Sequence, residues 1–388
     1  MTFRRTALAI TLSLLAPLPA MAAGGGAAAY LKKPDAWFAS ADGKRIAANI
    51  LSYQSDLGGW PKNTDTVDAA YTGDRNELHP TFDNGATTDE LRFLAHCINA
   101  TNSESEKNSL TADIADDTDL KNRRKEPQVP EKSSSSEKSA VKNSSYLPAF
   151  TKGLAYILKA QYSTGGWPQF YPPSKQYHRH ITFNDGAMVR LLEFLREVNT
   201  SDTYAFVPAA DRQAAGEAFD KGIACILKCQ IKVDGKPTVW CAQHDEIDYS
   251  PRPARAFELA SFSGSESVGI VHLLMSLDHP SSEVIAAVDG AVAWFESAKL
   301  TGIRLDRQPD PKAKKGTNLV VVPDPTAPPQ WARFYDLKTQ KPFFCDRDGI
   351  PKSTIAEIGD ERRNGYGWYG AWPQELLEKE YPAWKKRL

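Results

Sequence analysis

The chain has 388 residues, 41% of them hydrophobic, and is therefore long enough to bury a large core. Its formal net charge of −1 argues against nucleic acid or a membrane surface as the main partner, because both require a strong excess of basic residues. The five cysteines are odd in number and widely spaced, so they do not form a disulfide framework. Any affinity for a polyanion must then come from arginines that are concentrated locally.

The N-terminal residues 1–22 have the three parts of a secretory signal. Arg4 and Arg5 form the basic start, an apolar stretch follows, and a small-residue cleavage site ends at Ala22. The apolar stretch is too short for a membrane-spanning helix. We therefore expect a monomer that is exported, either secreted or periplasmic. Residues 23–35 are predicted to be a flexible lead-in to a single domain spanning residues 36–388.

Two helical patterns open this domain. The first runs over residues 37–54 and stops before the Gly-Gly-Trp-Pro stretch at 58–61, because Gly-Gly and Pro cannot continue a helix. The second begins after Thr-Phe-Asp-Asn-Gly at 81–85, where Thr or Asp is the N-cap. Residues 99–145 then interrupt the pattern. They are rich in Ser, Lys, Glu and Asp and almost lack aromatic residues, which predicts a disordered surface insertion.

The same unit returns after the insertion. Residues 165–171 read Gly-Gly-Trp-Pro-Gln-Phe-Tyr and match residues 58–61. A glutamine stands six residues before the tryptophan in both units. Thr-Phe-Asn-Asp-Gly at 182–186 opens a helix as Thr-Phe-Asp-Asn-Gly does at 81–85. This correspondence indicates an internal structural repeat.

A looser third copy predicts the fold class. It has a helical stretch at 226–230, then Trp240, then Ser-Phe-Ser-Gly at 261–264. Repeated helical hairpins bury their apolar faces only against one another. Because we find no convincing run of alternating strands, the predicted fold is all-α, an (α/α)3 toroid of helical hairpins with long irregular loops.

This toroid would gather polar residues at one mouth, because every repeated helix start would lie at the same end. The residues concerned are Asp83, Asn84, Asn184, Asp185, Ser263, Glu266 and Arg255. Each of them is equally explained as a helix cap or a surface charge. The repeat alone therefore leaves two interpretations open, a shared site and a set of separate caps.

A proline-braced loop at residues 250–258 adds cations to this set. It reads Ser-Pro-Arg-Pro-Ala-Arg-Ala-Phe-Glu, and proline restricts the backbone that carries Arg252 and Arg255. Such a loop suits an anionic substrate, although arginines that only pair with nearby acids would look the same. Carboxylate and amide oxygens without His or Cys partners favour a hard cation such as calcium. Together these features point to an acidic polysaccharide.

Several blocks of the chain resemble the motifs of family 10 pectate lyases. They are Gly-Gly-Trp-Pro-Lys-Asn at 58–63, Gly-Gly-Trp-Pro-Gln-Phe-Tyr-Pro at 165–172, Ile-Thr-Phe-Asn-Asp at 181–185, Ala-Arg-Ala-Phe-Glu at 254–258 and Glu-Arg-Arg-Asn-Gly-Tyr at 361–366. The resemblance covers the chain from about residue 37 to residue 372, apart from the insertion. It implies an (α/α)3 toroid and calcium-dependent β-elimination of polygalacturonate.

The resemblance also implies roles for individual residues. Arg255 is similar to the catalytic base of the family, which would remove the C5 proton of galacturonate. The residues that match the calcium region are Asp83, Asn84 and Asp185, and the candidate carboxylate-binding residues are Lys62, Arg333, Arg347 and Arg363. Because the pKa of arginine lies far above neutral pH and a base must be unprotonated, we expect an alkaline pH optimum.

Two other functions remain open from the sequence. A glycoside hydrolase needs two carboxylates across the scissile bond, and Asp245, Glu258 or Glu266 with Asp185 would supply them. A non-catalytic sugar-binding protein would use the same loops. The ultraviolet absorbance of an unsaturated product distinguishes elimination from hydrolysis, and release of shorter chains distinguishes both enzymes from a binding protein.

Overall fold

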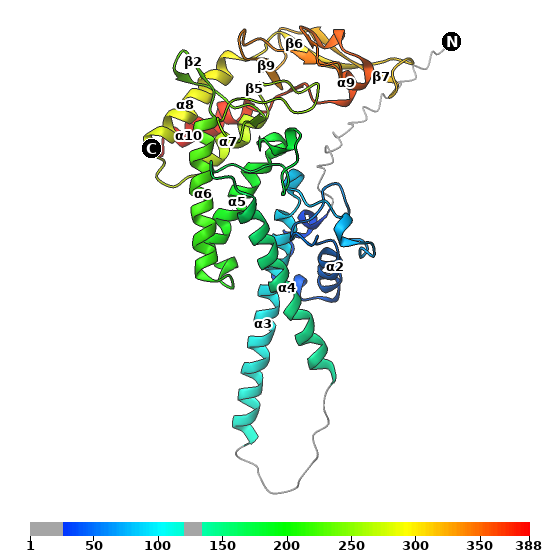
Figure 1. The fold of residues 1–388 in the computed structure, drawn as a ribbon, viewed down its shortest axis with the longest axis vertical. Helices are drawn as coiled ribbons and strands as arrows, with labels where there is room; N and C mark the ends of the chain where they lie inside the picture. The colour runs from blue at the N-terminus through cyan, green and yellow to red at the C-terminus, as the bar shows by residue number, and fades with distance from the viewer. Residues whose placement is uncertain (1–25, 120–133) are drawn as a thin grey trace, which may run out of the picture.

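The computed structural model of the chain describes residues 26–119 and 134–388, with side chains for residues 26–103 and 145–388. The predicted secretory signal at residues 1–22 lies outside the described residues, and so does the centre of the predicted insertion, residues 120–133. Long helices make up one part of the molecule, and the longest strands lie at the opposite end (Figure 1).

The α-helices of the described residues are α1 (Asp35–Phe38), α2 (Ala41–Ser52), α3 (Thr88–Asp119), α4 (Ser134–Ala160), α5 (Ala187–Thr200), α6 (Ala209–Cys229), α7 (Glu266–Met275), α8 (Ser282–Ser297), α9 (Asp360–Gly365) and α10 (Tyr381–Lys385). Short 3-10 helices are η1 (Ala27–Tyr30), η2 (Arg75–Glu77), η3 (Asp83–Gly85), η4 (Tyr177–Arg179), η5 (Asn184–Gly186), η6 (Asp202–Tyr204) and η7 (Ile355–Glu357), and η8 (Leu376–Glu380) is a π-helix. Consecutive long helices pack in pairs, α3 on α4, α5 on α6 and α7 on α8.

All the sheets are two-stranded and antiparallel. The longest pairs β6 (Ile303–Pro309) with β7 (Thr317–Pro323). The short ones pair β1 (Ile181–Thr182) with β4 (Gln243–His244), β2 (Lys232–Val233) with β3 (Lys236–Pro237), β5 (Ser261–Ser263) with β9 (Phe334–Asp336), β8 (Trp331–Ala332) with β12 (Tyr369–Gly370), and β10 (Phe344–Cys345) with β11 (Pro351–Lys352). Several of these ladders join loops that are far apart in the sequence.

The prediction of an all-α toroid is wrong, because the structure is a mixed one with 46% helix and 13% strand. Two physical reasons explain the error. Most of the strands have only two or three residues, too few for an alternating pattern to be visible in the sequence. The longer hairpin does carry strand signals, a β-branched run from Val320 to Val322 and a turn near Gly316. A single hairpin, however, does not change a fold class that is predicted from helical patterns repeated along the chain.

The repeat unit is built around a glutamine that is buried in the first and third units and half-buried in the second. The side-chain amide of Gln54 donates to the carbonyls of Gly58 and Ala149, at 2.7 and 2.8 Å, and so connects the turn of its own unit to the next helix. Gln161 and Gln230 repeat the arrangement on Gly165 and Ala218 and on Thr238 and Ala287. Each glutamine therefore satisfies two carbonyls at a junction between units.

The repeated tryptophans pack inside the molecule and do not line a cleft. Trp60, Trp167 and Trp240 are fully buried, and each indole N–H donates to the backbone carbonyl of an isoleucine in the preceding helix. A buried indole needs such a partner because an unpaired N–H in the core is costly. The aromatic loops of the sequence are thus mainly a packing device.

Two regions that we predicted to be flexible contain helical structure. Within the predicted lead-in, Ala27 is buried in the core and Tyr30 stacks on Trp37 at 5.3 Å. Within the predicted insertion, α3 continues to Asp119 and α4 begins at Ser134. The single-domain organisation of residues 36–388 stays a prediction.

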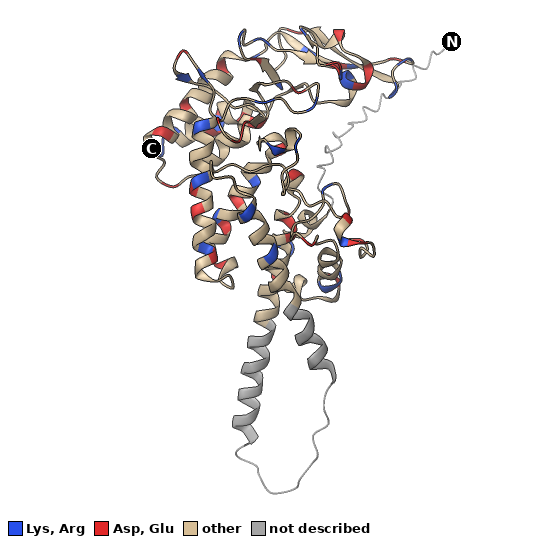
Figure 2. Cartoon of the chain, viewed as in Figure 1, with Lys and Arg blue, Asp and Glu red and all other residues tan. Residues whose placement is uncertain are grey.

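The surface charge agrees with the near-neutral composition. Acidic and basic residues alternate along α6, where Asp211, Arg212, Asp220 and Lys221 follow one another within a few turns (Figure 2). Among the helices that the structure describes, none is long and apolar enough to cross a bilayer.

Candidate active site

Two turns of the same backbone shape form the floor of the candidate site. η3 and η5 lie against each other, and the middle residue of each has left-handed geometry, Asn84 with φ 55° and Asp185 with φ 52°. A glycine with positive φ follows each of them, and Asn and Asp are the non-glycine residues that tolerate this conformation best. Each turn is also hydrogen-bonded to the aromatic loop of the next unit, Phe82 to Gln169 and Phe183 to Ala242.

Asp83 is the buried acid of the first turn, with only 2% of its surface exposed. Its Oδ2 accepts from the ammonium of Lys62 and, at 2.7 Å, from Nε2 of Gln169. Its Oδ1 is buried without any partner. A buried carboxylate oxygen with no donor is rare, and it marks a position where a ligand or ion would be stabilised.

Asp185 is the acid of the second turn and lies in the open part of the site, with 38% of its side chain exposed. Its Oδ2 accepts from Asn184 at 2.7 Å, and its Oδ1 is 3.4 Å from Nη2 of Arg333. Partial burial raises the pKa of Asp185, with a further contribution from Glu266, whereas Arg333 opposes the rise.

Arg333 connects the second turn to the third unit. Its guanidinium also forms an ion pair with Glu266, which is buried at the start of α7. Burial lowers the pKa of Arg333, but Glu266 outweighs that effect, so the pKa is raised and the guanidinium remains charged. Arg333, a candidate carboxylate-binding residue from the sequence, thus lies beside Asp185 and Glu266, and its role stays a prediction.

Arg255 shares the ring of Tyr366 with Arg333 and is held by Glu258. Its Nε donates to Oε2 of Glu258 at 2.7 Å, a second bond links the same two side chains, and the backbone N–H of Arg255 also donates to Oε2. This hydrogen bonding to Glu258 raises the pKa of Arg255 well above the ordinary arginine value. The charge of Arg255 lowers the pKa of Asp185 while that of Asp83 raises it, so all three residues lie within electrostatic reach of one another.

A cluster of guanidinium groups surrounds the rings of Phe257 and Tyr366. Arg255 and Arg362 lie over Phe257 at 4.9 and 4.5 Å from the ring centre. Arg347 approaches the same ring at 5.7 Å, and Arg333 lies 5.2 Å from Tyr366. Apart from the contact of Arg333 with Asp185, the four cations pair with three carboxylates, those of Glu258, Glu266 and Glu361, which leaves the cluster with one excess positive charge that favours a further carboxylate.

Arg362 is the member of this cluster that the sequence analysis missed, and Arg363 is the predicted member that the structure does not bring there. Arg363 donates to the carbonyl of Ala356 at 3.2 Å and lines a separate cavity beside β7. Successive residues on a helix point about 100° apart, so only one of two adjacent arginines on α9 can face Phe257. The sequence shows that two adjacent arginines are available here, but it does not show which of them faces Phe257.

The carboxylates that we considered for a hydrolase are all engaged by arginines. Glu258 pairs with Arg255 and Asp245 with Arg252, at 2.7 and 2.9 Å. Burial raises the pKa of Glu258, but hydrogen bonds from Arg255 and Tyr366 outweigh it and the pKa is lowered. A glycosidase needs one carboxyl group that stays protonated, and Glu258, whose pKa is lowered, does not supply it.

Another cluster with ligand-type side chains does not add a metal site. Among the described residues, His180, Asp245 and Glu246 bring possible ligand atoms within 4.8 Å of one another. However, Glu246 accepts from Arg179 and His180, and Asp245 accepts from Arg252. These ion pairs use the oxygens that a cation would need.

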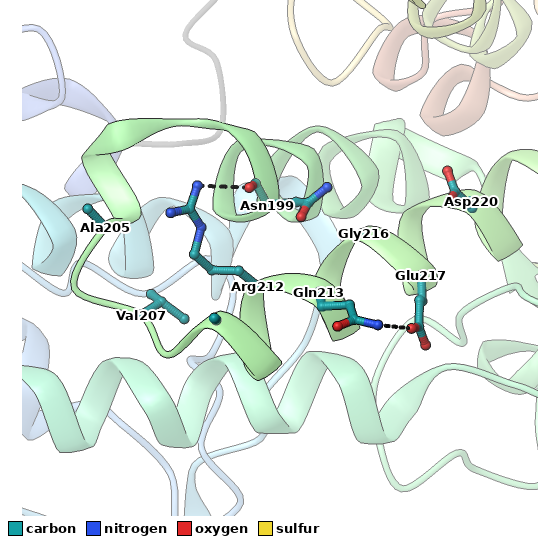
Figure 3. Close-up of a pocket in the computed structure, with 9 residues that line it drawn as sticks. Asn199, Ala205, Val207, Arg212, Gln213, Gly216, Glu217 and Asp220 are labelled. Atoms are coloured by element: carbon teal, nitrogen blue, oxygen red, sulfur yellow. Dashed lines mark hydrogen bonds between the residues drawn. The ribbon is translucent and has the colours of Figure 1, made fainter.

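A cavity of about 550 Å³ between α5 and α6 is also separate from the site (Figure 3). Its polar side chains bond to neighbouring groups, Arg212 to the carbonyl of Asn199 at 2.8 Å and Gln213 to Glu217 at 3.0 Å. No residue of the two turns or of the arginine cluster lines it. The two acidic turns and the arginine cluster therefore form the candidate site, and this cavity is not part of it.

Comparison with known proteins gives the class and the family. The sequence model of the pectic acid lyase family matches residues 54–115 and 135–377. Two solved structures are similar, a family 10 polysaccharide lyase from Cellvibrio cellulosa and a mutant of it in complex with trigalacturonic acid. Each is 34% identical to this chain with a TM-score of 0.69, and the matches cover 92% of this chain and 95% and 96% of the two relatives. No curated protein gives a match.

The fold, the site and these matches define a polysaccharide lyase. The chain belongs to the pectic acid lyase family, polysaccharide lyase family 10, and is a pectate lyase. The resemblance inferred from the sequence blocks is thereby confirmed. The toroid that we attached to it is not, because the family 10 relative is not an all-α toroid either.

Proposed function

We propose that this pectate lyase cleaves polygalacturonate by calcium-dependent β-elimination, with Arg255 as the base. The observation that carries the proposal is the link between the acidic turns η3 and η5 and the arginine cluster, made by Arg333, which contacts both Asp185 and the ring of Tyr366. The relative from Cellvibrio cellulosa was solved with trigalacturonic acid, which supports an oligogalacturonate as the substrate of this chain.

The oxygens on the two turns fit a calcium ion. Oδ1 of Asp83 is buried and unpartnered, and Asp185 and Asn84 add carboxylate and amide oxygens on adjacent turns. Donor sets of oxygen without sulfur or imidazole suit a hard cation. A bound Ca²⁺ would supply positive charge next to the substrate carboxylate and thereby favour the negative charge that develops when C5 loses its proton.

The arginine cluster holds the uronate carboxylates in this proposal. Arg347 is the most accessible cation, with 67% of its side chain exposed, whereas Arg333 is 15% exposed and forms the inner wall. Lys62 already bonds to Asp83 and would bind the substrate from the other side of that acid. Of the four substrate-binding residues proposed from the sequence we retain these three, and Arg362 takes the place of Arg363.

Arg255 removes the C5 proton of the galacturonate unit in our proposal. The electrons of the C5–H bond form the C4–C5 double bond, the C4–O4 bond breaks, and O4 takes a proton from water. Arg255 must be neutral to accept the C5 proton, whereas its hydrogen bonds to Glu258 raise its pKa and keep it charged. The rate should therefore rise with pH through the alkaline range, because the neutral fraction grows tenfold per pH unit.

The test is the ultraviolet absorbance of polygalacturonate incubated with the enzyme. We expect unsaturated product to accumulate, a calcium chelator to stop it, and added Ca²⁺ to restore it. Replacement of Arg255 by Ala should lower kcat by about 10²–10⁴-fold, the usual contribution of a general base, while trigalacturonic acid still binds. Shortened chains without absorbance, or full activity in excess chelator, would contradict the proposal.

The N-terminal signal predicted at residues 1–22 supports an enzyme that meets its polymer outside the cytoplasm. The monomeric state stays a prediction from the sequence.

A further inference from the structure

A second cavity, about 810 Å³ in volume, adjoins the site on the side of Lys62. It lies between residues 53–81 of the first unit and residues 169–178 of the second. Lys62 and Gln169 both line it, and both donate to Asp83. The cavity is therefore continuous with the proposed calcium and substrate cleft, and its volume is within the range of sites that bind small ligands.

The outer walls of this cavity are aromatic and apolar. Tyr53 and Tyr71 pack together with ring centres 5.3 Å apart, and Phe170 lies 5.1 Å from the ring of His178. Leu57 is unusually exposed for a large apolar residue, at 49%, and lines the same space. Ring faces beside open apolar surface bind the C–H faces of sugars.

The charges of this cavity are unlike those of the arginine cluster. Among the described residues that line it there is no arginine, and its lysine, Lys62, lies at the boundary with the candidate site, where it pairs with Asp83 and would hold the uronate beside that acid. Glu77 contributes an exposed negative charge. Burial lowers the pKa of His178 and Lys62 lowers it further, whereas Asp83 opposes the shift, so the surroundings favour the neutral imidazole.

These features distinguish between the two kinds of unit found along a pectin chain. A free uronate beyond Lys62 would lose water and face Glu77 with no arginine in the lining, which is unfavourable. A methyl-esterified unit carries no charge and would bury its methyl group against Leu57 and the tyrosines. At the arginine cluster, in contrast, a free uronate is favoured over a methyl-esterified unit because it pairs with the guanidinium groups.

We infer that this cavity is a distal subsite for a methyl-esterified galacturonate unit, adjacent to the free uronate that reacts beside Asp83 and Asp185. The inference rests on the proposed function, because it requires a galacturonate chain to run through the cleft. It predicts that kcat/KM is higher on partly esterified pectin than on fully de-esterified polygalacturonate.

The experiment compares kcat/KM on a partly methyl-esterified pectin and on the same stock after complete de-esterification, normalised to cleavable bonds. For the wild type we expect the esterified polymer to be favoured by about fourfold, the effect of burying one methyl group. The Leu57→Lys variant adds an unpaired cation to the cavity, so its preference should move to the de-esterified polymer. Leu147→Lys is the matched control, because Leu147 is a similarly exposed leucine, at 41%, on α4 outside the cavity.

Each outcome has a separate meaning. A wild type that favours the de-esterified polymer, or a ratio that Leu57→Lys and Leu147→Lys change equally, would overturn the subsite while leaving the proposed function intact. Absence of unsaturated product from both polymers would overturn the proposed function, and the subsite with it.

Discussion

At the scale of single residues, the pairing of Arg255 with Glu258 sets the charge of the proposed base. Glu258 is 4% exposed and bonds to Arg255 and to the hydroxyl of Tyr366, which donates at 2.6 Å. Because this carboxylate stabilises the charged guanidinium, it raises the pH at which a neutral Arg255 becomes available.

Removal of that carboxylate should move the pH profile. In Glu258→Gln the pKa of Arg255 falls, by about 1–3 units if the effect is typical of a close ion pair, so the alkaline rise in kcat begins at lower pH. The measurement is kcat as a function of pH with saturating polygalacturonate. Tyr366→Phe is the control, since it removes a hydrogen bond to Glu258 but keeps the negative charge. A profile that does not move in Glu258→Gln would exclude Arg255 as the titrating base.

At the scale of elements, the two acidic turns share one backbone but differ in the space around their glycines. Gly85 has φ 82°, and a Cβ there would lie 2.2 Å from Oδ2 of Asp89. Gly186 has φ 72°, and its Cβ would meet no heavy atom closer than 3.8 Å, at Nε of Arg190. Equivalent positions of the repeat thus have different tolerance for a side chain.

This difference predicts unequal costs for the same substitution. Gly186→Ala should lower the free energy of unfolding by about 1–2 kcal/mol, the cost of left-handed geometry for a residue with a Cβ. Gly85→Ala should lower it by at least ~1 kcal/mol more, because Asp89 must also move. Denaturant unfolding of the two variants checks the order, and equal losses would show that the crowding at Gly85 is relieved without cost.

The orientation of the short helix α9 determines which of its two adjacent arginines joins the candidate site. Arg362 lies over Phe257 and is 11% exposed, whereas Arg363 turns toward Ala356. The indole of Trp368 donates to the carbonyl of Arg362 and fixes that end of the helix. The rotation of α9, not the residue type, decides which arginine joins the site.

At the scale of the whole molecule, a buried carboxyl group couples folding to pH. Glu90 near the start of α3 is 5% exposed and accepts from the backbone of Thr87 and the hydroxyl of Thr66. Burial raises its pKa to about 7, with Asp89 adding to the effect. Since the unfolded pKa is 4.5, the folded state binds more protons between these values, and stability falls as the pH rises from about 4.5 to 7.

Removing this titration should flatten the pH dependence of stability. We expect the difference in unfolding free energy between pH 5 and pH 8 to shrink in Glu90→Gln by up to about 3 kcal/mol, the product of the pKa difference and 1.36 kcal/mol per unit. Thermal or denaturant unfolding of both proteins at the two pH values measures it. If the difference between pH 5 and pH 8 is the same in both proteins, groups other than Glu90 cause the pH dependence of stability in this range.

The mixed architecture is the largest feature that sequence reasoning did not reach. A helix repeats its pattern over three or four turns of contiguous chain, so the paired long helices left a clear signal. A two-residue ladder such as that between β8 and β12 depends on a partner more than 35 residues away, and its own residues carry little pattern. Such short strands form only when distant loops pack together, so they are recognised in the tertiary structure and not in the sequence.

The sequence by itself determined the repeat, the family and the acids of the two turns, because the Gln, Trp and Phe-x-x-Gly positions act through contacts within or next to their own unit. Only the tertiary structure decided that Arg333 reaches Asp185 across 148 positions, that Arg362 faces the site in place of Arg363, and that a cavity lies beside Lys62 and Gln169. Such contacts depend on how distant segments pack, and packing is a property of the folded chain as a whole.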